Sequence, residues 1–377
     1  MNQIIIYGAG NTGIKYYEVF QRCGMEDMIY AFCDRNYMEI KKIGEVPVYP
    51  YEELEALNIP FIIAMAMHEE VCERLENAGN IYYVNLEKWI QDYIKNDMDR
   101  IKLQIVYSNL KTGECESEGI LNNLDKGIFE NINALKLDKA VKIYGGTCPC
   151  CKKNTLFISH HYWLRDHYKC LFCKSIPRQR ALMKVLETEV PAWRNLRIHE
   201  SSPSGPTFHV LKQQCSQYTY SYWYEEKALG ESLEGDIVTN QNLENMIFED
   251  NVFDVFLTQD VLEHVNEPDK VFPEIARVLK KGGVHIFTTP LYPFRKTISR
   301  IQMERGKREC VLPPIYHMNP VDQNGSLVTY EWGYDFLDLI DKNVGMESKI
   351  IEFPNSKENF ENGLEADFLQ VIVSKKI

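Results

Sequence analysis

The feature that most constrains the fold is an ordered series of strand, polar loop, helix and strand in the second half of the chain. An apolar segment at residues 253–256 leads into a polar run that contains Gln259, Asp260 and His264. A helix then ends near Leu279, and Gly282-Gly283 turns the chain into the next apolar strand. Because open α/β sheets bind ligands at the carboxyl ends of their strands, the polar run predicts a ligand site at such an edge.

These motifs resemble the second half of class I S-adenosylmethionine-dependent methyltransferases of the type 11-like group. The resemblance covers about residues 196–377, and it implies a doubly wound α/β domain with S-adenosylmethionine as cofactor. It also implies that Gln259, Asp260 and Val261 lie over that cofactor. Topology alone would not name a ligand, since strand, helix and Gly-Gly turn recur in every doubly wound sheet.

The rest of the cofactor site departs from the pattern of the family. Its first strand ends in an acid-x-Gly-x-Gly loop, whereas this chain has Glu200-Ser201-Ser202-Pro203-Ser204-Gly205. No acid ends the second strand at residues 218–223, although Glu225 and Glu226 follow closely. These departures leave open a scaffold with a degenerate cofactor site. The cofactor residues that the resemblance implies in these segments are Glu200, Ser201, Ser202, Gly205, Ser221, Asn242 and Leu243.

An insertion at about residues 291–330 separates the fifth strand from the closing elements and carries many polar groups. His317, in this insertion, is our first candidate for general base, because an imidazole with a pKa near 6.5 can accept a hydroxyl proton. His264 is the alternative, and positioning without a strong base is a third. The insertion resembles a subset of methyltransferases associated with glycan biosynthesis, which implies a sugar or nucleotide-linked glycan precursor as acceptor and O- rather than N-methylation.

The pattern of apolar runs and glycines in residues 1–95 predicts a separate Rossmann-like domain with four strands. Gly8-Ala9-Gly10-Asn11-Thr12-Gly13 lies at a strand-to-helix junction, and Asp34 ends the second strand about 20 residues later. The glycines and the helix N-terminus suit a diphosphate. The domain resembles the small nucleotide- or coenzyme-A-binding-like domains of some bacterial sugar acyltransferases, which implies a nucleotide-sugar ligand for Gly8, Gly10, Asn11, Gly13 and Asp34. An empty scaffold is the alternative.

Four cysteines between the two domains predict a metal site. Cys148, Cys151, Cys170 and Cys173 form a C-x2-C-x18-C-x2-C pattern, and this spacing is typical of zinc ribbons. We expect a structural Zn²⁺ in a ribbon at residues 146–180, preceded by a connector at 96–145 and followed by the methyltransferase domain at 181–377. Replacement of one ligand by Cys150 or a histidine, and a redox role, stay as alternatives.

The composition opposes nucleic acid as the acceptor. The 377 residues carry a formal net charge of −12, whereas duplex binding depends on Lys and Arg that neutralise phosphates. An RNA methyltransferase is therefore the second choice. No apolar stretch approaches the roughly 18 to 20 residues that span a bilayer, and the chain does not start like a signal peptide. We expect a cytoplasmic enzyme, with a homodimer left open.

Overall fold

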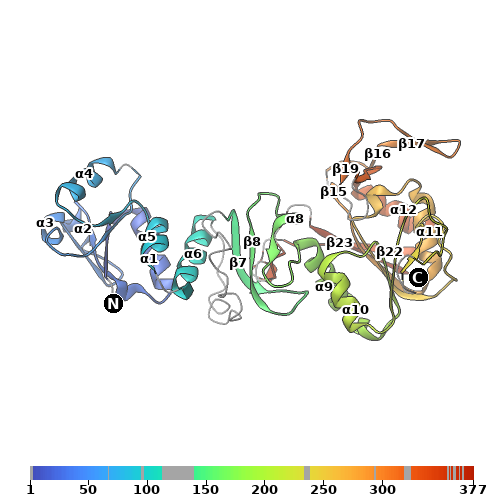
Figure 1. Ribbon diagram of the computed structural model, residues 1–377, viewed down its shortest axis with the longest axis horizontal. Coiled ribbons are helices and arrows are strands. Elements are labelled where there is room, and N and C mark those ends of the chain that lie inside the picture. Colours follow the sequence, from blue (N-terminus) through green and yellow to red (C-terminus); the bar gives the residue numbers. More distant parts are fainter. Residues whose placement is uncertain are drawn as a thin grey trace. The chain divides into compact units, whose positions relative to one another are not determined.

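The computed structural model describes residues 3–66, 68–94, 97–112, 140–232, 238–292, 294–317 and 324–354, and, of the last segment, residues 356, 358–359, 362–364, 366 and 369–377. The chain divides into two compact units, residues 1–145 and 146–377 (Figure 1). Most of the predicted connector, residues 113–139, lies outside the described residues. No helix of the described residues is both long and apolar enough to cross a bilayer.

The first unit contains a six-stranded sheet in the order β3-β4-β2-β1-β5-β6. Its pairings are parallel except for the β3–β4 hairpin. The strands are β1 (Ile4–Tyr7), β2 (Ile29–Cys33), β3 (Lys42–Ile43), β4 (Val46–Tyr49), β5 (Phe61–Ile63) and β6 (Tyr82–Tyr83). The helices are α1 (Asn11–Arg22), η1 (Glu26–Met28), α2 (Tyr37–Ile40), α3 (Tyr51–Leu54), α4 (Glu69–Asn77), α5 (Leu86–Tyr93) and α6 (Asp97–Thr112).

Two features of this unit differ from the sequence prediction. Beyond the four predicted strands, the sheet contains the β3–β4 hairpin, and β4 pairs with β2 through Phe32 and Val48. Helix α6 was assigned to the connector, but the rings of Tyr16 in α1 and Tyr107 in α6 lie 5.8 Å apart. The first unit therefore extends past residue 95, because α6 covers part of its surface.

The second unit is built on a seven-stranded sheet in the order β12-β11-β10-β13-β14-β23-β22. The strands are β10 (Ile198–Ser201), β11 (Tyr218–Tyr222), β12 (Val238–Asn240), β13 (Phe253–Gln259), β14 (Leu279–Thr288), β22 (Met346–Glu352) and β23 (Gln370–Lys376). The first five run parallel, whereas β23 is antiparallel to both of its neighbours. Ile198, Val255 and Ile286 are fully buried, which explains why their strands occupy the centre of the sheet.

Helices and short strands complete this unit. The helices are α8 (Leu164–His167), α9 (Pro177–Glu189), η4 (Trp193–Asn195), α10 (Gly205–Gln214), η5 (Leu262–His264), α11 (Pro268–Val278), η6 (Tyr334–Phe336) and α12 (Leu337–Val344). A three-stranded sheet contains β7 (Lys142–Thr147), β8 (Asn154–Ser159) and β9 (Lys169–Cys170). The predicted insertion forms β15 (Leu291–Tyr292), β16 (Ile298–Ser299), β17 (Ile301–Glu304), β18 (Lys307–Cys310), β19 (Tyr316–His317), β20 (Ser326–Leu327) and β21 (Tyr330–Gly333).

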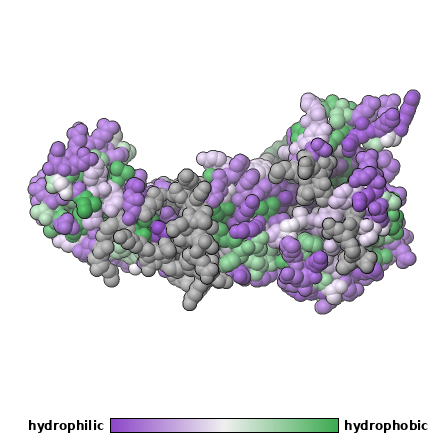
Figure 2. Space-filling model, viewed as in Figure 1, coloured by the Kyte–Doolittle hydropathy of each residue, from purple (hydrophilic) through white to green (hydrophobic). Residues whose placement is uncertain are grey.

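The glycine pair Gly282-Gly283 was expected to precede a strand, but it lies within one. Gly282, with φ +77°, lies inside β14 and produces an irregular register against β13, so the pair kinks a strand rather than preceding it. A Cβ at Gly283 would lie 2.9 Å from the carbonyl oxygen of Lys280. In the insertion, strand β18 of the β17–β18 hairpin is exposed and mostly hydrophilic (Figure 2), whereas Ile301 of β17 is buried.

Candidate active site and cysteine cluster

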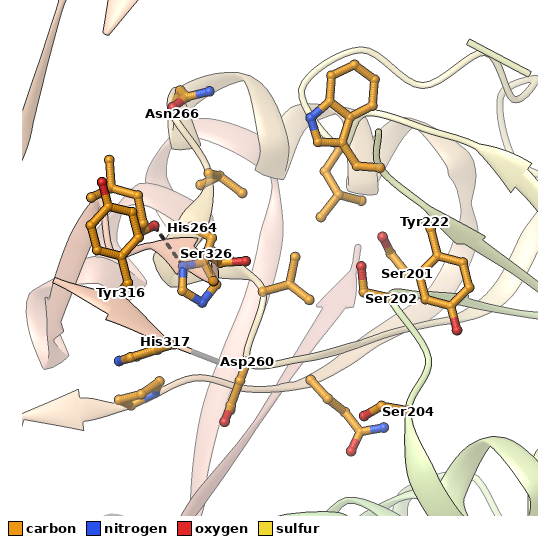
Figure 3. Close-up of a pocket in the computed structure, with 18 of the residues that line it drawn as sticks. Ser201, Ser202, Ser204, Tyr222, Asp260, His264, Asn266, Tyr316, His317 and Ser326 are labelled. Carbon is orange, nitrogen blue, oxygen red and sulfur yellow. Dashed lines mark hydrogen bonds between the residues drawn. The ribbon is translucent and has the colours of Figure 1, made fainter. Parts of the chain in front are cut away.

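A cavity of about 1780 Å³ opens at the carboxyl ends of β10, β11, β12 and β13. This volume exceeds the roughly 300 to 1,000 Å³ of most small-molecule pockets, so a cofactor and an acceptor can occupy it together. Figure 3 shows the serine loop and Tyr222 on one side, with His264, Tyr316 and His317 on the other. The predicted site residues that line the cavity are Ser201, Ser202, Asn242, Leu243, Gln259, Asp260, Val261, His264 and His317.

The serine loop after β10 adopts the backbone expected of glycine. Ser202 has φ +58° and Gly205 has φ +64°, which is the left-handed region that favours glycine. The Ser202 N–H donates to the carbonyl of Ser221 at 2.8 Å and so holds the loop against β11. The missing glycine therefore does not prevent the tight turn, and the loop leaves Ser201, Ser202 and Ser204 on the cavity wall.

Gln259 has an unpaired carbonyl oxygen beside this loop. Its amide nitrogen donates to Glu200 Oε1 at 2.7 Å and to Thr207 Oγ1 at 2.9 Å. Its Oε1 is buried and has no hydrogen-bond partner among the described residues. A buried acceptor of this kind needs a donor, and an amino group of a ligand in the cavity would supply one.

Glu200, Gly205 and Ser221 support the cavity wall rather than line it. Glu200 is fully buried and accepts from Gln259 and the Tyr218 hydroxyl. Burial raises its pKa to about 7, although these hydrogen bonds act in the opposite direction. Ser221 contacts His199 Nε2 at 3.0 Å inside the sheet, and a Cβ at Gly205 would lie 2.5 Å from the Gln179 amide.

The ends of β11 and β12 bring further polar groups to the cavity. Glu225 and Glu226 line it just after β11, where the family has a single strand-end acid. The buried Asn240 side chain donates to the carbonyls of Tyr224 and Lys227 at 3.1 and 2.9 Å and holds this loop in place. Beyond β12, Leu243 is 5% exposed, while Asn242 accepts from the N–H of Glu244 at 2.9 Å.

Asp260 forms a buried ion-pair network with two arginines of the cysteine-rich segment. Arg165 of α8 donates to both carboxylate oxygens at 2.7 and 2.8 Å, and Arg178 of α9 donates at 2.9 Å. Burial opposes ionisation of Asp260, but the two guanidinium charges outweigh it and hold the pKa of this carboxyl below its usual range. Through these ion pairs, Asp260 connects the loop after β13 to α8 and α9. The Asp260 backbone has φ +52°.

Glu263, His264 and His317 meet at the other side of the cavity. Glu263 Oε1 lies 3.9 Å from His264 Nε2 and 3.8 Å from His317 Nδ1. Burial raises the pKa of Glu263 to about 7, and the charge of Asp260 acts in the same direction. Burial lowers the pKa of both histidines, so each favours the neutral form that accepts a proton.

The cysteine cluster brings together the four predicted ligands. Their sulfur atoms lie within 4.8 Å of one another, and the Cys148–Cys173 and Cys151–Cys170 sulfurs are 3.7 and 3.9 Å apart. Four thiolates about 2.3 Å from a tetrahedral Zn²⁺ would be roughly 3.8 Å apart, so the arrangement suits this ion. Cys150 is buried beside Cys148 but is not one of the four clustered sulfurs.

Two turns of the same geometry deliver these sulfurs. Lys152 and Lys174 each follow the second cysteine of a C-x2-C pair and have φ +61° and +63°. Their N–H groups donate to the carbonyls of Cys148 at 2.8 Å and Cys170 at 3.0 Å. The repeated turn orients both cysteine pairs toward one point. A metal ion needs four sulfurs around one point, whereas a disulfide needs only two sulfurs to meet.

The glycine-rich turn of the first unit has the local geometry that the sequence predicts. Gly8 has φ +112°, and a Cβ at Gly13 would lie 2.0 Å from the Gly8 carbonyl oxygen, so α1 starts close against β1. Gly10 precedes α1, and Asn11 begins it. Asp34 accepts from the N–H groups of Ala9 at 2.7 Å and Asn36 at 2.8 Å, so its carboxylate helps to hold the turn itself.

Several residues of the cavity were not among the predicted site residues. Trp163, Arg165 and Asp166 line the cavity although they come from the segment between the cysteine pairs. Their sequence signal is weak, because a run of basic residues usually marks a solvated surface. Glu263 was also missed, although it lies next to His264 in the polar run and so had a recognisable signal.

Comparisons with known proteins concern the second unit. Residues 204–287 match the type 11 family model described as a methyltransferase domain. The glycine/sarcosine/dimethylglycine N-methyltransferase of Actinopolyspora halophila is 39% identical over 54 residues, which are 14% of this chain and only 10% of that protein.

Solved structures show low identity. An S-adenosylmethionine-dependent methyltransferase from Mesorhizobium loti has 14% identity and a TM-score of 0.36, and the match covers 52% of this chain and 98% of that one. The YcgJ protein of Bacillus subtilis has 14% identity and a TM-score of 0.34, with coverages of 52% and 97%. Residues 204–287 of the second unit therefore match a methyltransferase domain, and this stretch contains β11, β12, β13 and nearly all of β14.

Proposed function

We propose that this protein transfers a methyl group from S-adenosylmethionine to a hydroxyl oxygen of a sugar or nucleotide-linked glycan precursor. The observation that carries the cofactor assignment is the cavity at the strand ends, lined by Ser202, Gln259 and Glu225, in the unit whose residues 204–287 match a methyltransferase domain. When bound, S-adenosylmethionine supplies an electrophilic methyl group. Ser201, Ser202, Asn242, Leu243, Gln259 and Val261 would hold it, and Asp260 would keep the wall in place.

The acceptor would occupy the opposite side of the cavity, near His264, His317 and Ser326 (Figure 3). His317 is half-exposed and faces the buried Glu263 carboxylate, so it can take the hydroxyl proton while that carboxylate stabilises the imidazolium. The acceptor oxygen would form the new bond to the methyl carbon as the carbon–sulfur bond breaks. The electron pair of the broken bond would stay on sulfur. His264 serves better as a positioning residue, because its Nδ1 already contacts the Leu327 carbonyl at 2.8 Å.

The remaining assignments concern the other modules. The four-cysteine cluster would bind a structural Zn²⁺ and thereby fix α8 and α9, which carry Arg165 and Arg178. In the first unit, Gly8, Gly10, Asn11, Gly13 and Asp34 would bind the nucleotide end of the acceptor. The net charge of −12 supports a small acceptor over RNA.

Calorimetric titration with S-adenosylhomocysteine tests the cofactor assignment. Glu225 and Glu226 line the cavity just after β11, where either carboxylate would accept from the ribose hydroxyls of the cofactor. We expect micromolar binding by the parent protein and a loss of roughly tenfold in Glu225→Gln or Glu226→Gln, because such hydrogen bonds are charge-assisted. Glu249→Gln, at an exposed site that does not line the cavity, is the matched control. No binding by the folded parent protein would favour the scaffold alternative.

Turnover assays then identify the acceptor class. Nucleotide sugars and free sugars should accept radiolabelled methyl groups, and glycine and sarcosine serve as amine acceptors because of the local identity to an N-methyltransferase. Transfer only to the amines would overturn the proposed acceptor while leaving the cofactor assignment intact.

A further inference from the structure

A second cluster of metal-binding side chains lies in the methyltransferase domain, apart from the cysteines. Glu263 and His264 belong to η5, and His317 belongs to β19 in the insertion. One donor atom from each lies within 4.8 Å of the other two. Two segments more than 50 residues apart in sequence therefore bring two imidazoles and a carboxylate to one point.

Glu263 has one satisfied and one unsatisfied carboxylate oxygen. Its side chain is only 2% exposed, and its Oε2 accepts from Thr289 Oγ1 at 3.0 Å. Its Oε1 is buried without a hydrogen-bond partner among the described residues, and it faces both imidazoles. A buried, unpaired carboxylate oxygen is costly unless a cation or a donor reaches it.

His264 presents a lone pair to this oxygen. Its Nδ1 lies 2.8 Å from the Leu327 carbonyl, and since a carbonyl only accepts, Nδ1 carries the proton in the neutral ring. The lone pair is then on Nε2, which lies 3.9 Å from Glu263 Oε1. Histidine ligands of metals commonly donate their other ring N–H to a backbone carbonyl in this way.

We propose that Glu263, His264 and His317 bind one divalent transition-metal ion in the wall of the cavity. Two imidazoles and a carboxylate suit Zn²⁺, Fe²⁺, Mn²⁺ or Co²⁺ and leave coordination positions open. Ligand atoms about 2.1 Å from such an ion lie roughly 3.0 to 3.4 Å apart, so each imidazole nitrogen must approach Glu263 Oε1 by roughly 0.4 to 0.9 Å. His317 is 43% exposed on a hairpin, so rotation of its side chain can shorten its own distance, while Glu263 and His264 must close their separation of 3.9 Å by adjusting within η5.

The open positions would face the acceptor side of the cavity, which His264 and His317 line together with Ser326. A hydroxyl that coordinates a divalent ion has a lowered pKa, so the acceptor would lose its proton to water in the cavity, and the ion would replace His317 in preparing the acceptor oxygen. This role in deprotonation rests on the proposed function. Binding of the ion to Glu263, His264 and His317 is independent of the proposed function.

Cobalt titration of the full-length protein tests the site. One equivalent of Zn²⁺ is added first to fill the cysteine cluster, and Co²⁺ binding is then followed by visible absorption. We expect one Co²⁺ per chain with ligand-field bands and without the thiolate charge-transfer bands of cysteine sites. His317→Ala and Glu263→Gln should each weaken this binding by roughly 100-fold or more.

His209→Ala, which removes an exposed histidine of α10, is the matched control and should bind Co²⁺ like the parent. No cobalt binding by the parent, cobalt bound through thiolates, or equal binding by parent and His317→Ala would each overturn the proposal. S-adenosylhomocysteine titration of the same samples separates the two hypotheses, because failure of the metal site alone leaves that binding unchanged.

Discussion

At the scale of single residues, burial determines which ionisable groups change the stability of the domain. His199 and His285 are each 1% exposed in the central sheet. Burial lowers the pKa of each to about 3 from 6.5. The unfolded chain thus binds more protons between these values, so the stabilisation from each neutral histidine is complete above pH 6.5 and decreases as the pH falls toward 3.

Replacement of His285 tests whether a buried neutral histidine makes the stability depend on pH. The parent should lose about 2 kcal/mol of unfolding free energy per buried histidine between pH 7 and pH 5, and His285→Gln should lose about 2 kcal/mol less than the parent. Urea unfolding at the two pH values measures the difference. Glu200, whose pKa rises to about 7, makes the folded state more stable as the pH falls from 7 to 5. Both proteins contain Glu200, so its effect cancels in the comparison. Equal losses in the parent and in His285→Gln and His199→Gln would contradict this account.

At the scale of elements, the cysteine-rich segment is coupled to the cavity wall through α8 and α9. Arg165 and Arg178 meet Asp260 at the end of β13, and Arg165 is only 6% exposed. Arg180 of α9 is fully buried and donates to the Tyr168 carbonyl at 2.9 Å. Disruption of the cysteine cluster should therefore disturb the cavity as well as the ribbon.

Arg165→Met measures the strength of this coupling. Loss of one partner of a buried ion pair should lower the free energy of unfolding by about 3 kcal/mol, the low end for such changes because Arg178 remains beside Asp260. Arg194→Met is the control, since Arg194 is 43% exposed and its surface pair should contribute less than about 1 kcal/mol. Urea unfolding of both variants gives the comparison, and equal stability would show that the Asp260 network does not hold these elements together.

At the scale of the whole molecule, the residues that line the cavity all belong to the second unit. They run from Trp163 to Leu327, whereas the first unit ends at Gly145. A domain with its own core and its own binding site can bind its ligand independently.

A chain of residues 140–377 should therefore bind S-adenosylhomocysteine within about twofold of the affinity of the full-length protein. Calorimetric titration of both proteins makes the comparison, and circular dichroism checks that the shorter chain is folded. A large loss of affinity in a folded sample would show that the first unit contributes to the cofactor site.

The sequence by itself determines the local elements and the metal-ligand spacing. Short apolar segments next to polar loops and the Gly-Gly turn predict β13 and β14, and the C-x2-C pairs predict the cysteine turns, because both signals depend on neighbouring residues. The strand-end motif likewise predicts Gln259, Val261 and His264 on the cavity wall. The tertiary structure alone decides that Arg165 and Arg178 neutralise Asp260, that Ser221 faces the sheet interior and that Glu263 meets His317. These pairings join segments 22 to 95 residues apart, and no local pattern encodes the packing that brings them together.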